Sequence, residues 1–132
     1  MNNQVHKKIT LFENFCILLH SMHWSIEMIN KAEIQCGLKK NYHKLLFLNG
    51  MTQLVQEFEY WLDEKMLDTL SEIEKPKGVR KQIALALETR IINVVSQNIT
   101  LKNSSFFMIP TNILAGSENI YRTCDLIWKY AG

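Results

Sequence analysis

The chain has 132 residues, of which 47% are hydrophobic and 21% charged, and its formal net charge is +2. This is long enough for a hydrophobic core. It contains no run of eighteen apolar residues, no secretory signal and no arginine-rich transit peptide, so we expect a cytoplasmic protein without a membrane span. Three widely spaced cysteines without a C-x-x-C argue against disulfide and zinc frameworks. Two prolines and five glycines among long periodic segments predict an all-α protein.

The first part of the chain predicts three short helices. Apolar residues at helical spacing predict a helix over 5–21. Ser25 is expected to cap a second helix that ends at Gly37, the residue type most common just past a helix end. A short third helix is expected over 39–47. Residues 1–49 are therefore predicted to form a helix-turn-helix-like unit.

Longer helices are predicted over 50–132, as a helical second unit of the same compact chain. The first begins near Thr52 and carries its apolar residues in one stripe, with acidic residues, Asp63 among them, on the opposite face. The segment 76–78 breaks the chain. The next helix, over 79–97, has apolar residues on two faces and is expected to be buried on both.

A loop, a broken helical segment and a final helix are predicted for the C-terminal part. Residues 102–105 are polar and are expected to form a loop. The apolar segment 106–115 is interrupted at Pro110. The pair 116–117 is then expected to cap a final amphipathic helix over 119–132.

That final helix carries the most informative motif of the sequence. Within 121–132, Asp125 stands three residues before Trp128. The run resembles a segment of the COQ-nine family, accessory proteins of ubiquinone biosynthesis with a TetR-like fold. The family usually has tyrosine, arginine, threonine, any residue, aspartate, any residue, isoleucine and tryptophan there, followed by alanine, glycine and aspartate. Weaker matches extend over nearly the whole chain, at 23–25, 61–67, 79–83 and Arg90.

The resemblance implies a non-enzymatic, lipid-binding protein at the periphery of the inner membrane. It would present an isoprenoid quinone intermediate to a demethoxyubiquinone hydroxylase-like protein. The sequence stops one residue before the family's last aspartate. We therefore expect a form truncated at the C-terminus: a split piece, a remnant, or a short form that dimerises differently, as a homodimer.

A lipid tail leaves a bilayer only if a cavity replaces its hydrophobic burial, at roughly 25 cal/mol per Å² of apolar surface. In this chain the same apolar stripes would also serve as an ordinary core. The residues expected to line such a cavity are Phe58, Leu62, Met66, Ile83, Leu87, Ile91, Phe106, Ile109, Ile113, Leu114, Tyr121 and Trp128.

Asp125 and Trp128 are expected to act as a structural motif. The carboxylate would cap a neighbouring helix or pair with Arg122, and the indole would pack beneath it. No catalytic triad, glycine-rich phosphate loop or nucleophile elbow occurs, so we expect no catalytic residue and no cofactor other than a bound isoprenoid lipid.

A basic segment supports the alternative of a TetR-type DNA-binding regulator. It would offer cations to phosphates, of DNA or of lipid headgroups, and an asparagine to an adenine edge. Its residues are Lys39, Lys40, Asn41, His43 and Lys44. DNA is the less favoured partner, because TetR-type dimers use late helices that this sequence lacks. A solvated basic helix and a small protein-interaction module are further alternatives.

The histidines invite a metal hypothesis that the sequence does not support. His20 and His23 lie three residues apart, but at the end of a predicted helix. The Glu-x-x-His pattern of di-iron helical bundles is missing. We therefore expect no metal site.

Overall fold

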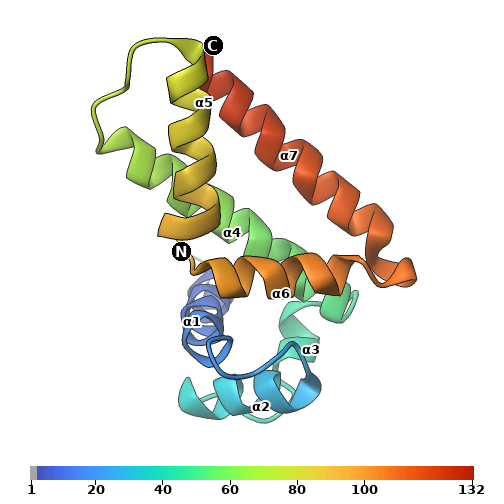
Figure 1. The fold of residues 1–132 in the computed structure, drawn as a ribbon. Helices are drawn as coiled ribbons and strands as arrows, with labels where there is room; N and C mark the ends of the chain where they lie inside the picture. Colours follow the sequence, from blue (N-terminus) through green and yellow to red (C-terminus); the bar gives the residue numbers. More distant parts are fainter. Residues whose placement is uncertain (1–2) are drawn as a thin grey trace. The chain divides into compact units, whose positions relative to one another are not determined.

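Every regular element that the computed structural model describes, over residues 3–132, is helical. The all-α prediction is therefore confirmed. None of these helices is long and apolar enough to cross a bilayer. The α-helices are α1 (Asn3–Leu18), α2 (Ile26–Gln35), α3 (His43–Leu46), α4 (Met51–Ser71), α5 (Val79–Glu88), α6 (Gln97–Phe107) and α7 (Ile113–Ala131) (Figure 1).

The chain folds as two compact units, Met1–Val55 (unit 1) and Gln56–Gly132 (unit 2). We expected the division after residue 49, whereas the boundary lies inside α4.

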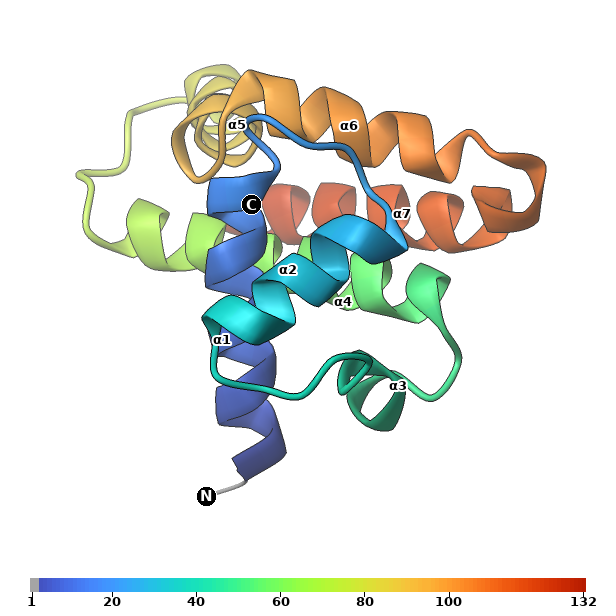
Figure 2. The same cartoon turned by 90° about the horizontal axis from the view of Figure 1, so that it is seen from below.

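Unit 1 is built on the packing of α2 against α1 (Figure 2). Its core includes Leu11, Phe15 and Ile29, which are fully buried. The Ser25 cap is confirmed, because its hydroxyl accepts a hydrogen bond of 3.1 Å from the Met28 N–H at the start of α2.

The third helix is shorter than the sequence predicts, since it spans only His43–Leu46. Asn41 has a φ of 68°, in the left-handed region that a right-handed helix cannot contain. The Asn41 N–H instead donates to the carboxylate of Glu33 at 2.9 Å. Because the fully buried Glu33 holds Asn41 in this non-helical conformation, the helix begins only at residue 43.

The core of unit 2 is formed where α4, α5 and the C-terminal half of α7 pack together. Its buried members include Met66, Leu70, Ala86 and Ile127. In Figure 1, α5, α6 and α7 form the three sides of a triangle, and α6 and α7 meet at the 3-10 turn Pro110–Asn112.

The predicted helix over 79–97 is wrong in its second half. Helix α5 ends at Glu88, and a π-helical turn, Thr89–Asn93, follows it. Single π turns are rare and are often found at functional sites. Here the turn contains Arg90, whose guanidinium is buried against carboxylates of α4.

The predicted loop over 102–105 is also wrong, because these residues lie inside α6. Ser96 caps the helix by accepting a hydrogen bond from the Ile99 N–H at 3.3 Å. The polar residue Asn103 is buried and donates to Glu59 of α4 at 3.0 Å. A polar residue at position 103 therefore makes a buried hydrogen bond within unit 2 and does not mark a loop.

Gly116 does not cap the last helix, which begins at Ile113 and runs through it. A Cβ atom at this position would lie only 2.7 Å from Cβ of Phe107 in α6. The glycine therefore allows α7 to approach α6 closely. The turn between α6 and α7 is also stabilised by Asn112, whose side-chain amide donates to the Phe106 carbonyl at 3.0 Å.

Replacement of Gly116 by valine is expected to lower the free energy of unfolding by about 1–3 kcal/mol, the usual cost of overpacking. The reason is that Cβ of Phe107 cannot swing away as the end of a flexible side chain could. Urea unfolding measures the change. Ser117→Val, at the exposed neighbouring position, is the control and should stay within about 0.5 kcal/mol of the wild type. A stabilised Gly116→Val variant would show that α6 shifts without cost.

Candidate functional site

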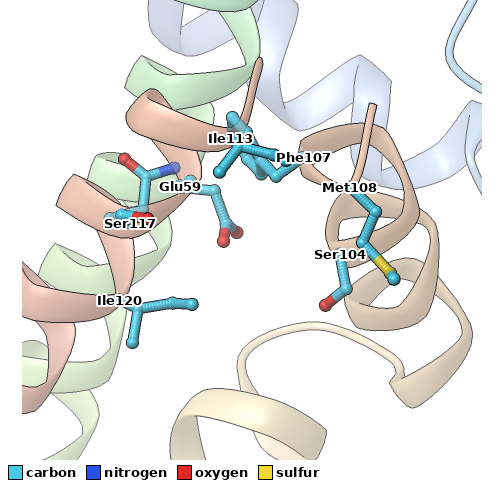
Figure 3. Close-up of a pocket in the computed structure, with 9 residues that line it drawn as sticks. Glu59, Ser104, Phe107, Met108, Ile113, Ser117 and Ile120 are labelled. Carbon is cyan, nitrogen blue, oxygen red and sulfur yellow. The ribbon is translucent and has the colours of Figure 1, made fainter. Parts of the chain in front are cut away.

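A cavity of about 360 Å³ lies between α6 and α7 in unit 2, and Glu59 of α4 also lines it. Most of its wall is apolar, and Glu59 contributes the only ionisable side chain among its lining residues. Figure 3 shows the Glu59 carboxylate between Ser104 and Met108 on one side and Ser117 and Ile120 on the other. The lining residues are Glu59, Ser104, Phe107, Met108, Ile113, Gly116, Ser117, Asn119 and Ile120.

A smaller hollow of about 160 Å³ adjoins this cavity towards α5. The two share Glu59, Asn119 and Ile120, so these side chains stand between them. The other residues of the hollow are Leu87, Arg90, Ile91, Thr100, Thr123, Cys124 and Ile127. Together the two spaces form an apolar groove with a polar partition.

Asp63 is the centre of a buried ion network behind the groove. Its side chain is 1% exposed. One carboxylate oxygen accepts hydrogen bonds from Arg90 Nε at 2.8 Å and from the Thr123 hydroxyl at 2.7 Å. The other accepts from Arg122 Nη1 at 2.8 Å. The network therefore ties the π-helical turn and α7 to α4.

Arg90 joins Asp63 to the wall of the cavity. Its Nη2 donates to Glu59 Oε2 at 3.0 Å, and the Asn103 side chain donates to the same oxygen. Burial lowers the pKa of Arg90, but Glu59 and Asp63 outweigh burial, and the pKa lies above its usual value. The guanidinium therefore stays charged, and both carboxylates serve as its structural partners.

The expected pair between Asp125 and Arg122 is not found, because Arg122 binds other carboxylates. Its guanidinium binds Asp63 and, at 3.2 Å, Glu64, and lies 4.6 Å from the centre of the Tyr60 ring. Asp125 instead pairs with Lys129 at 2.9 Å, one turn further along α7. Trp128 does not pack beneath a carboxylate, because it is 66% exposed.

Asn119 is the most unusual residue of the groove. It is 4% exposed, yet neither its amide nitrogen nor its amide oxygen has a hydrogen-bond partner. Buried polar groups in native proteins nearly always have one. Asn119 lines both the cavity and the hollow.

The twelve predicted lipid-binding residues fall into three groups. Phe58, Leu62, Met66 and Phe106 are buried, and the partly buried Ile83 packs on the core. Ile113 lines the cavity, and Leu87 and Ile91 line the hollow. The remainder are exposed, by about half to four fifths: Ile109, Leu114, Tyr121 and Trp128.

Three of these four exposed residues belong to an apolar stripe on one side of α7. Leu114, Tyr121 and Trp128 recur every seven residues, and Ile113 and Ile120 lie beside them. Ile113 and Ile120 also line the cavity, so the stripe continues from its wall.

Sequence reasoning missed the polar residues that lie in the groove and behind it. Asp63 was expected on the solvent face of its helix, but it is fully buried. Glu59 lies one helical turn before it, and this i, i+4 pair of carboxylates, with Arg90 among the apolar residues of the helix predicted over 79–97, is the signal that could have revealed the network. Nothing in the sequence singles out Asn119.

The basic segment of unit 1 is only partly available to a ligand. Lys39, Lys40 and Lys44 are exposed. His43 is buried, and its backbone N–H and ring Nδ1 both contact Glu33, at 2.6 and 2.8 Å. Asn41 lies in the turn before α3, which is a single helical turn.

Among residues 3–132, no three His, Cys, Asp or Glu side chains gather in an arrangement suited to a metal ion. The chain matches no protein-family model, and no curated protein or solved structure shows a match to it.

Proposed function

We propose that unit 2 binds an isoprenoid lipid in the groove between α6 and α7. The observation that carries this proposal is the 360 Å³ cavity with its apolar wall, a volume within the range of small-molecule sites, roughly 300–1,000 Å³. The exposed stripe on α7 extends this wall and offers further apolar surface to a long tail. Burial against these side chains would replace what the tail loses on leaving a bilayer, at roughly 25 cal/mol per Å².

The proposal extends to the biological role that the sequence resemblance implies. The chain would be a non-enzymatic, COQ-nine-like accessory protein of ubiquinone biosynthesis with a TetR-like arrangement of helices. It would present a quinone intermediate to a hydroxylase at a membrane surface. Exposed Tyr121 and Trp128 suit such a surface, because tyrosine and tryptophan favour the boundary between apolar and aqueous phases.

A bound lipid should protect Cys124 from alkylation. Cys124 is exposed and lines the hollow beside the cavity. A ubiquinone with a short isoprenoid tail, at ten times its dissociation constant, should slow modification about tenfold, because only free protein then reacts. Mass spectrometry of iodoacetamide-treated protein measures the rate at each cysteine.

Cys16 and Cys36 of unit 1 provide the internal reference, since neither lines the groove. Burial, Glu13 and Glu33 raise the pKa of the Cys36 thiol, so this cysteine should react slowly with or without lipid. Unchanged Cys124 reactivity, together with an organic extract of the purified protein that holds no isoprenoid, would exclude the lipid-binding proposal.

DNA binding is the second candidate, and the exposed Lys39 and Lys40 favour it. With Lys7 they line a surface hollow of about 530 Å³ in unit 1. The buried His43 and the one-turn α3 give less support to base recognition. A regulator would bind duplex DNA with an affinity that falls steeply as salt rises, whereas lipid binding would depend little on salt.

A further inference from the structure

The unpaired amide of Asn119 indicates which chemical group a ligand of this groove would carry. An unsatisfied buried polar group is unfavourable for folding, and the residue lies where the cavity and the hollow meet. A carboxamide offers hydrogen-bond donors at its nitrogen and an acceptor at its oxygen. A ligand group that both accepts and donates would satisfy both atoms at once.

The negative charge of Glu59 limits which ligand groups could bind beside Asn119. Its carboxylate lines both spaces, and the Arg90 and Asn103 side chains hold it at Oε2, each at 3.0 Å. The network behind the groove contains three carboxylates, Glu59, Asp63 and Glu64, and only two guanidiniums, so its formal charge is one negative. A ligand carboxylate or phosphate would be repelled there, while a neutral hydroxyl would be accepted.

We propose that Asn119 is a specificity-determining residue that binds a neutral hydroxyl or phenol on the lipid, beside the Glu59 carboxylate. The apolar part of the ligand then lies along the wall formed by Phe107, Ile113 and Ile120. This inference rests on the proposed lipid binding and adds which lipids are selected. Isoprenoid alcohols and phenols bind more tightly than isoprenoid acids and phosphates.

Three probes with the same isoprenoid chain test the assignment: geranylgeraniol, its methyl ether and geranylgeranoic acid. The ether keeps an acceptor but loses the donor, and the acid is an anion at neutral pH. The wild type should bind the alcohol about tenfold more tightly than the ether, which corresponds to about 1.4 kcal/mol for one hydrogen bond. The acid should bind more weakly than the ether. Displacement of a fluorescent lipid measures all three.

Asn119→Leu is the informative variant, because leucine has a similar size and removes both unpaired atoms. The variant should bind alcohol and ether equally. Its ligand-free form should melt at the same temperature as the wild type or higher, because a buried unsatisfied group is gone. Asn98→Leu makes the same change at an exposed position of α6 outside the groove, and should keep the preference for the alcohol.

The outcomes separate this inference from the proposed function. If the wild type binds alcohol and ether equally and Asn119→Leu changes nothing, the role of Asn119 is overturned while lipid binding stands. A variant that melts lower without any change in selectivity would mean that Asn119 only stabilises the fold, and would also overturn it. If no probe binds the wild type, lipid binding itself fails, and the selectivity with it.

Discussion

Replacement of Asp63 by alanine is expected to lower the free energy of unfolding by about 3–5 kcal/mol, the usual result of removing one partner from a buried ion pair. The side chain accepts three hydrogen bonds, from Arg90, Arg122 and Thr123. Without it, the buried guanidinium of Arg90 keeps only its contacts with Glu59. Urea unfolding followed by circular dichroism measures the loss.

Glu64→Ala is the matched control for this variant. Glu64 is the next residue of α4 and also pairs with Arg122, but its side chain is 59% exposed. Exposed pairs contribute about 0–1 kcal/mol. Equal losses for the two variants would mean that Asp63 is hydrated in solution and that the network does not organise unit 2.

Replacement of Met66 by alanine is expected to cost about 2–5 kcal/mol, as for other large apolar residues truncated in a core. Met66 is fully buried and belongs to the core that also contains Leu70, Ala86 and Ile127. It was predicted as a lipid contact, but it does not line the cavity. The variant should therefore lose stability while its preference between lipid alcohol and ether stays unchanged.

Tyr121→Ala provides the contrast on α7. Tyr121 is 76% exposed, so its truncation should change the free energy of unfolding by no more than about 0.5 kcal/mol. Thermal unfolding of both variants gives the comparison. If Met66→Ala proved as harmless as Tyr121→Ala, the core of unit 2 would be looser than its burial indicates.

Periodicity and capping predicted much of the helical structure. The buried stripe of α4 and the Ser25 cap of α2 depend on neighbours in sequence, and both are found as predicted. The errors arise where a residue that is distant in sequence determines where a helix begins or which residue it contains. Glu33 delays α3 by binding Asn41, and Phe107 requires the glycine within α7 that had been taken for a cap.

The site was predicted less well than the fold, for a related reason. The cavity is lined by side chains of α6 and α7 together with Glu59 of α4, and no stripe of one helix encodes how these helices are placed relative to one another. Apolar spacing selected Phe58 and Leu62, which fill the core. It could not select Glu59 or Asn119, because their place in the groove depends on partners in other helices.

Three hydrogen bonds that hold α6 in place affect the rates at which a ligand could associate and dissociate. Near its start the Thr100 hydroxyl donates to the Ile91 carbonyl at 2.9 Å, in its middle Asn103 binds Glu59, and just beyond its end Asn112 binds the Phe106 carbonyl. A wall fixed at three points is already ordered before binding, so little conformational entropy is lost on association. Related lipids should then arrive at similar rates and differ mainly in residence time.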